Sequence, residues 1–229
     1  MSIKKTALLF TLLLSFSSAQ ATVNTQPNNN ANQTSSQVLA DLKAGNQRFL
    51  NNQQIHRDYL KEIRETSVGQ YPETAVLNCM DSRNIPELTF DQGIGEIFAV
   101  RIAGNIVNDD ILGSLEYATA VVHARLIVVM GHTSCGAVHG ACKNAELGFL
   151  TALLAKIQPA IREAKETMPN ATCQDPKFID EIARRNVQRM VQEIPQRSSV
   201  IADLIAKNKV KIIGAMYDIS TGKATFLEN

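Results

Sequence analysis

The sequence contains no tryptophan, few aromatic residues and only four histidines among its 229 residues. It has no block of lysine and arginine, so nucleic acid and anionic lipid surfaces are not expected partners. Beyond the N-terminus it also lacks any apolar run near the roughly 20 residues that span a bilayer. With 45% hydrophobic and 20% charged residues, the composition is typical of a globular protein of one domain.

The one apolar run of note lies at the N-terminus, where Lys4 and Lys5 precede residues 7–14. Ala19-Gln20-Ala21 then fits a cleavage site, which completes the layout of a secretory signal peptide. We predict a signal peptide at 1–21, a flexible polar leader at 22–37 and a single domain at 38–229. The mature chain would be periplasmic in a Gram-negative host and free of the membrane; a retained N-terminal helix is the alternative.

Apolar segments of strand length alternate with helical patterns through the rest of the chain. Strands are predicted at 74–78, 96–102, 125–130 and 210–217, with an edge strand at 224–227. Helices are predicted at 38–50, 110–123, 135–142, 146–167 and 176–208, with Ser35 or Ser36 as the first N-cap and Pro159 and Pro195 kinking or dividing the last two. This pattern indicates an α/β fold whose central sheet has about four parallel strands plus an edge strand, flanked by helices.

Residue types that bind metals follow two of the predicted strands. Cys79 follows the first strand, and His132 and Cys135 follow the third. Sites in parallel sheets form at the carboxyl ends of strands, so these side chains should meet. Two thiolates and an imidazole supply three of the four ligands of zinc, and a catalytic zinc leaves the fourth position to water. Asp81 could fill that position or pair with Arg83, which predicts a switch.

Each of these residues also has a simpler interpretation. A lone cysteine is commonly a small buried hydrophobe, and an Asp-x-Arg step is commonly a surface ion pair. In an oxidising compartment, four cysteines could also form two disulfides without any metal. A bond between Cys142 and Cys173 is compatible with either interpretation.

Two motifs together resemble the β-class carbonic anhydrases. Residues 79–83 (CMDSR) match the family's C-x-D-S-R segment, and residues 131–137 (GHTSCGA) match its G-H-T-x-C-G-A segment. The block between them, EIFAVRIAGNIV at 96–107, is also similar, and the resemblance extends from about residue 39 to 227. It implies one zinc ion per subunit on Cys79, His132 and Cys135, with Asp81 and Arg83 as a catalytic dyad and Asp81 a potential further ligand.

The resemblance implies reversible hydration of carbon dioxide to bicarbonate and a proton by zinc-bound hydroxide, in a homodimer or homotetramer whose active site is lined by both subunits. Gln70 stands where plant-type members carry a glutamine that contacts substrate across the interface, although a polar turn residue is an equal interpretation. Gly136 is the second expected substrate-binding residue, and its amide at the start of a helix could also donate a hydrogen bond to a thiolate ligand. The proton relay is left open among His56, His123 and His139, with His139 best placed.

One departure from some bacterial members concerns an inhibitory bicarbonate pocket. Val76 replaces the tryptophan of that pocket, although Arg101 and Tyr217 fall near its other positions, so such inhibition is not expected. Two other functions compete with the main prediction. One is hydrolysis of carbonyl sulfide or carbon disulfide on the same scaffold, and the other is a non-catalytic periplasmic zinc-binding protein.

Overall fold

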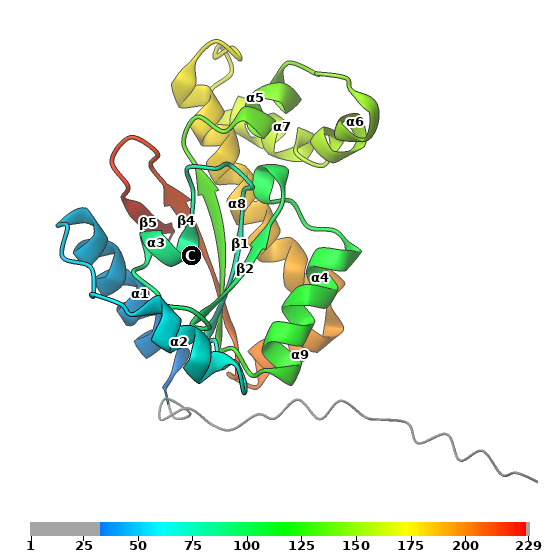
Figure 1. The fold of residues 1–229 in the computed structure, drawn as a ribbon. Coiled ribbons are helices and arrows are strands. Elements are labelled where there is room, and N and C mark those ends of the chain that lie inside the picture. The colour runs from blue at the N-terminus through cyan, green and yellow to red at the C-terminus, as the bar shows by residue number, and fades with distance from the viewer. Residues whose placement is uncertain (1–32, 228–229) are drawn as a thin grey trace, which may run out of the picture.

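A computed structural model describes residues 33–227, so the predicted signal peptide at 1–21 and most of the predicted leader at 22–37 lie outside the described residues. The centre of the fold is one five-stranded sheet (Figure 1). Its strands are β1 (Thr74–Asn78), β2 (Ile97–Arg101), β3 (Leu126–His132), β4 (Lys211–Tyr217) and β5 (Ala224–Leu227), arranged in the order β2-β1-β3-β4-β5. The first four are parallel and β5 is antiparallel to β4, which confirms the predicted sheet.

The position of β1 in this order creates the place for a site. The chain leaves β1 to form β2 on one side and later returns to form β3 on the other side. Asn78, the last residue of β1, is in register with Met130 of β3. The residues that follow the two strands therefore emerge side by side at the point where the strand order reverses, which is where α/β sheets place their ligands.

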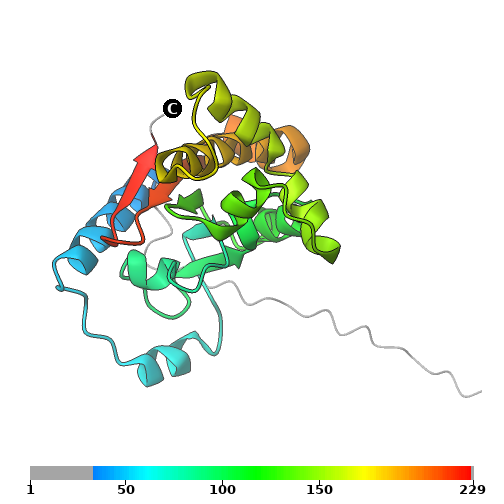
Figure 2. The same cartoon turned by 90° about the horizontal axis from the view of Figure 1, so that it is seen from above.

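Helices cover both faces of the sheet because its strands are apolar on both sides. Ala75 and Leu77 pack on one face against α4 (Asp109–Glu116), α8 (Pro176–Arg197) and α9 (Ser199–Ala206). Val76 faces the other way, toward α1 (Ser35–Leu50) and α3 (Pro86–Thr89), and Figure 2 shows α1 and α8 on opposite sides. A third cluster closes the carboxyl end of the sheet with α5 (Gly136–Cys142), α6 (Gly148–Ala155) and α7 (Gln158–Thr167). None of the helices within 33–227 has the length and apolar character of a membrane span.

Two helix boundaries differ from the sequence prediction. The N-cap of α1 is Thr34, not Ser35 or Ser36, because Thr34 forms a reciprocal capping box with Gln37. The helix therefore starts before the end of the predicted leader. The predicted helix at 110–123 begins at Asp109, capped by Asn108, and finishes as a wider π-helical turn, η2 (Tyr117–Val121).

The two predicted long helices are each divided, as expected, but only one divides at its proline. Residues 146–167 form α6 and α7, with Pro159 in the first turn of α7, where a missing amide proton costs no hydrogen bond. In residues 176–208, Pro195 lies inside α8, and the break falls at Ser198 instead. The Ser198 hydroxyl accepts a hydrogen bond from the Ile201 amide and so starts α9.

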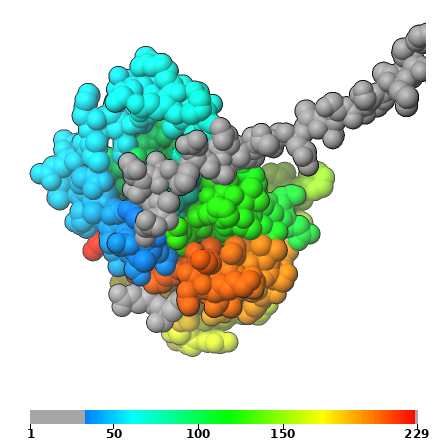
Figure 3. Space-filling view, turned by 90° about the horizontal axis from the view of Figure 1, so that it is seen from below, coloured from blue at the N-terminus to red at the C-terminus, as the bar shows by residue number. Residues whose placement is uncertain are grey.

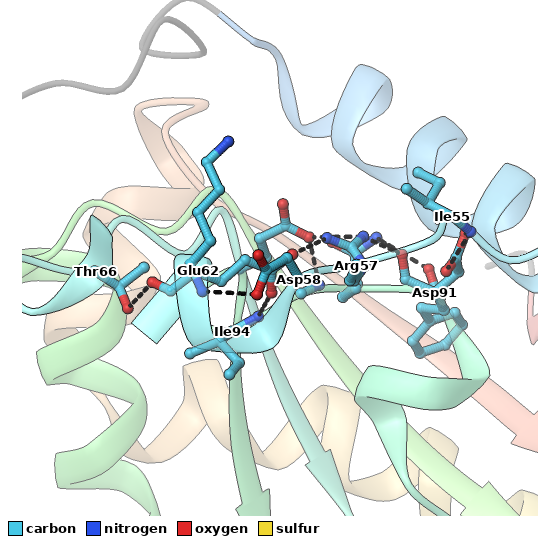
Figure 4. A network of polar contacts seen from close by, with 12 residues as sticks. Ile55, Arg57, Asp58, Glu62, Thr66, Asp91 and Ile94 are labelled. Atoms are coloured by element: carbon cyan, nitrogen blue, oxygen red, sulfur yellow. Dashed lines mark hydrogen bonds and ion pairs between the residues drawn. The ribbon is translucent and has the colours of Figure 1, made fainter. Parts of the chain in front are cut away.

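The helix α2 (Tyr59–Thr66) was not predicted, and it buries none of its residues. Polar contacts attach it to the body, as Figure 4 shows. Arg57 donates a 2.8 Å hydrogen bond to the Asp91 carbonyl and pairs with Glu62, and Glu62 accepts from the Ile94 amide at 3.0 Å. The segment stands away from the sheet in Figure 2 and forms the cyan lobe in Figure 3. The exposed apolar side chains in residues 55–68, on and around α2, are Ile55, Tyr59, Leu60, Ile63 and Val68.

The four cysteines divide into one disulfide and two thiols. Cys142 at the end of α5 is bonded to Cys173, 31 residues later and just before α8. Cys79 and Cys135 are free and buried. The interpretation with two disulfides and no use for the motif cysteines is therefore wrong.

Candidate metal centre

Three side chains from two neighbouring strand ends converge on one buried point. Cys79 directly follows β1, His132 is the last residue of β3, and Cys135 is the N-cap of α5. Their donor atoms, two sulfurs and one imidazole nitrogen, lie within 4.8 Å of one another. All three residues are buried, with 4%, 0% and 1% of their surface exposed. The structure thus brings together the metal-ligating trio that the strand pattern predicted.

The spacing of these atoms fits a tetrahedral metal. The sulfurs of Cys79 and Cys135 are 3.9 Å apart. Two sulfurs bound to one tetrahedral zinc ion at about 2.3 Å would lie about 3.8 Å apart. A shared ion therefore fits between them without movement of either strand end.

The imidazole of His132 is also prepared for a metal. Its Nδ1 lies 2.9 Å from the Thr133 carbonyl oxygen, which can only accept, so the neutral ring carries its proton on Nδ1. Its Nε2 is buried and has no hydrogen-bond partner among the described residues. A buried nitrogen lone pair without a donor is costly, and coordination of a metal would satisfy it.

The two sulfurs do not share negative charge equally. A hydrogen bond from Cys135 lowers the pKa of Cys79, against the effect of burial, and His132 and the Gly104 amide lower it further. The same contact with Cys79, together with burial, raises the pKa of Cys135. A second buried thiolate is thus opposed by the first. A bound divalent cation would remove this opposition, because it stabilises both deprotonated sulfurs.

The protonation of His132 follows from the same neighbours. Burial on its own would lower the pKa of His132, but Cys79, the Thr133 carbonyl and the Asp81 carboxylate together raise it. A metal ion bound to Nε2 would compete with that proton. The site therefore combines a buried thiolate with an imidazole nitrogen, and both groups can bind a soft divalent cation.

Asp81 lies at the edge of this pocket and is held by Arg83. The guanidinium donates through Nε to Oδ1 at 2.9 Å and through Nη2 to Oδ2 at 2.8 Å, and the Arg83 amide donates to Oδ1 at 3.0 Å. These bonds hold the pKa of the Asp81 carboxyl far below its usual range. Oδ2 is 3.9 Å from His132 Nε2, and Arg101 donates to the Asp81 carbonyl at 2.7 Å. Of the two predicted positions of Asp81, the structure contains the one paired with Arg83.

Sequence reasoning missed Gly104, which contacts the metal pocket through its backbone. Its amide donates to the Cys79 sulfur at 3.3 Å. Gly104 has φ +67°, and an added Cβ would lie 2.7 Å from Cδ1 of Ile157, so this close approach requires glycine. A glycine just after the predicted strand at 96–102, inside the block that resembles the family, was the available signal.

Gly136 and Gln70 are the two predicted substrate-binding residues. The Ala137 and Val138 amides oppose the raised pKa of Cys135, and the contact from the Gly136 amide stays a prediction. Gly136 lines a cavity of about 280 Å³ that also includes His139. Gln70 is exposed and precedes β1 by four residues, so within one chain it lies at the opposite end of the sheet from Cys79.

Comparison with known proteins places these features in one group. A family described as carbonic anhydrase matches residues 74–224. A Mycobacterium tuberculosis protein named carbonic anhydrase 2 is 33% identical over 194 residues, which cover 82% of this chain and 90% of that protein. A carbonic anhydrase of Mycolicibacterium smegmatis is 35% identical over 188 residues, with coverage of 80% and 88%.

Solved structures show the same fold at lower identity. A β-carbonic anhydrase of Aspergillus fumigatus superposes with a TM-score of 0.68 at 23% identity, over 84% of this chain and 90% of its own. One of two tetrameric β-carbonic anhydrases of Sordaria macrospora superposes with a TM-score of 0.67 at 23% identity, over 85% and 95%. These similarities show that the chain has the fold of those proteins.

The geometry predicts which side chains are needed to bind the metal. Replacement of Cys79 or Cys135 by Ser, or of His132 by Ala, should remove tight zinc binding, because each deletes one of three ligands. Asp81→Asn should retain zinc, because that carboxylate is engaged with Arg83. Metal analysis of the purified, dialysed variants checks this. Equal zinc content in the wild-type protein and in all three ligand variants would rule out the site.

Proposed function

Because this chain belongs to the β-class carbonic anhydrase family, we propose that it hydrates carbon dioxide reversibly to bicarbonate and a proton, with one zinc ion per subunit held by Cys79, His132 and Cys135. The observation that carries the proposal is the buried trio of donor atoms within 4.8 Å, with the Nε2 lone pair of His132 free. A zinc ion there supplies Lewis acidity, which makes hydroxide available near neutral pH.

Arg83 and Asp81 then have separate tasks at this pocket. The two-pronged bond from Arg83 keeps the Asp81 carboxylate ionised and engaged, so this carboxylate would not act as the fourth ligand of a zinc ion held by the trio. Asp81 Oδ2 still lies 3.9 Å from His132 Nε2. From there it can accept a hydrogen bond from a water molecule or from bicarbonate, and so orient it.

The pocket also provides an apolar environment for carbon dioxide. Cys79 and Cys135 belong to a hydrophobic cluster with Ile106 and Val138, and Ile102 packs against it. Carbon dioxide has no net charge or dipole, so apolar walls favour it over water, and exclusion of water strengthens the electrostatic contacts inside.

The position of His139 makes it a reasonable proton relay. It lies on α5, which begins directly after Cys135, and shares the 280 Å³ cavity with Ser134 and Gly136. His123 precedes β3 and is therefore at the other end of the sheet, and His56 lies in the segment before α2. We propose that His139, of these three candidates, passes the proton to buffer.

The role of Arg83 predicts a specific loss of activity. Arg83→Ala should retain zinc but lower the rate of carbon dioxide hydration by about 10- to 100-fold, because Asp81 is then free to approach the metal. Stopped-flow hydration assays on zinc-loaded protein measure this.

The matched control is Arg184→Ala, which removes a similar two-pronged pair, with Glu181 on α8. Its activity should stay within about twofold of wild type. If Arg83→Ala retains full activity, the assigned role of Arg83 is wrong.

The same assays separate the alternative functions. A wild-type protein that binds zinc but turns over carbonyl sulfide and not carbon dioxide would favour the hydrolase alternative, and turnover of neither would favour a non-catalytic zinc-binding protein.

We also propose that the protein is a homodimer or homotetramer in which Gln70 of one subunit reaches the pocket of another. Exposed apolar side chains on and around α2 support self-association, since monomeric proteins rarely expose such groups together. Gln70 lies at the opposite end of the sheet from Cys79 of its own chain, so contact with a metal centre would require a second subunit.

Sedimentation of the mature protein tests this proposal. A dimer or tetramer is expected at micromolar concentration, and Leu60→Asp and Ile63→Asp together should shift it toward smaller species because they place charges in an apolar contact. A wild-type monomer at that concentration would contradict the proposal.

Finally, we propose that the chain is exported and is periplasmic in a Gram-negative host. The N-terminal sequence has the layout of a signal peptide, and the Cys142–Cys173 disulfide suits an oxidising compartment. Expression in such a host should yield periplasmic protein that begins at Thr22. Recovery of uncleaved protein from the cytoplasm alone would overturn this proposal.

A further inference from the structure

Helix α8 carries a buried asparagine behind the metal pocket. Asn186 is fully buried, and its helical neighbours Ile182, Ala183, Val187 and Met190 are also buried. Its Nδ2 donates a 2.8 Å hydrogen bond to the carbonyl of Gly104. Its Oδ1 is buried with no hydrogen-bond partner among the described residues.

An asparagine in this position costs stability. A buried polar atom without a partner carries a desolvation penalty, and an apolar side chain of similar volume would avoid it. Within the described residues, the only hydrogen bond of the Asn186 side chain is the one to Gly104. We therefore look for the role of Asn186 in its effect on Gly104.

Gly104 connects Asn186 to the metal pocket. It lies in the turn η1 (Ala103–Asn105) that follows β2, in a left-handed conformation pressed against Ile157. Its carbonyl accepts from Asn186, and its own amide donates to the Cys79 sulfur at 3.3 Å. The bond to Asn186 therefore fixes the orientation of the residue whose N–H points at a metal ligand.

Hydrogen bonds to ligand atoms affect the metal. An N–H that donates to a thiolate stabilises its negative charge and orients the sulfur, and loss of such partners weakens metal binding. The same helix supports the other half of the pocket, since Asp180 accepts from the Ser134 amide at 2.8 Å, between His132 and Cys135. Thus α8 contacts the segment after β3, which carries His132 and Cys135, and the turn η1, whose Gly104 amide donates to Cys79.

We propose that Asn186 is a positioning residue of the metal centre: by holding the Gly104 carbonyl, it keeps the Gly104 amide bonded to the sulfur of Cys79. This inference rests on the proposed zinc site and adds to it a residue that is 82 positions away from Gly104 in the sequence. Asn186 touches neither metal nor substrate.

The test is Asn186→Leu, which removes the donor and keeps a similar volume. Its affinity for zinc, measured by competition with a chromophoric chelator, should fall about tenfold or more. In the cobalt-substituted protein, the sulfur-to-metal charge-transfer band should shift, because the Cys79 sulfur loses its donor. Neither readout depends on catalytic activity.

The matched control is Asn46→Leu. Asn46 is also a buried asparagine on a helix, and its Nδ2 donates to the carbonyls of Thr89 and Gly222, away from the metal pocket. This variant should lose stability to urea but keep the wild-type zinc affinity and cobalt spectrum. If Asn186→Leu does not fold, Asn186→Ser, which is smaller and cannot reach as far, takes its place.

The outcomes are distinguishable. Wild-type zinc affinity and an unshifted cobalt band in the Asn186 variant would overturn the positioning role, and so would an equal loss in both asparagine variants, which would indicate general loosening. Failure of the wild-type protein itself to bind zinc would instead contradict the proposed function.

Discussion

The structure depends on the parallel pairing of β1 with β3, which brings two thiols and an imidazole to one buried point. Neither strand end holds a complete ligand set, and the residues are more than 50 positions apart in the sequence. Burial of thiolates in an apolar cluster is unfavourable unless a cation offsets it. The opposite pKa shifts of Cys79 and Cys135 reflect this conflict. A divalent ion resolves it, and the surrounding contacts keep the donor atoms in place for that ion.

Those contacts come from several directions and act on different ligands. The Thr133 carbonyl fixes the tautomer of His132, and the Gly104 amide, held by Asn186, donates to Cys79. Arg83 draws Asp81 away from the trio, and Arg101 holds the Asp81 backbone. Two of the predicted ligands are thus oriented by hydrogen bonds, while the nearby Asp81 carboxylate is paired with the guanidinium of Arg83.

The sequence was sufficient to predict the features that have a regular apolar pattern or a short motif, namely the sheet and the residues at its strand ends. Alternation of apolar strands with helices predicted the parallel sheet, and the strand ends after Asn78 and Met130 predicted where ligands would meet. Gly104 was missed although the block around it was noted, and the contact between Asn186 and Gly104 could not be predicted, because a hydrogen bond across 82 residues leaves no periodic signal. The α2 segment was missed since polar contacts, rather than a buried stripe, hold it. The disulfide was left open because sequence gives cysteine pairs no geometry.

The central claim is that one metal ion is bound by two sulfurs and one imidazole nitrogen. X-ray absorption spectroscopy of the zinc-loaded mature protein measures these ligands directly. We predict two sulfurs at about 2.3 Å and two nitrogen or oxygen neighbours at about 2.0 to 2.1 Å, one from His132 and one from solvent. A first shell with no sulfur, or with four, would contradict the account.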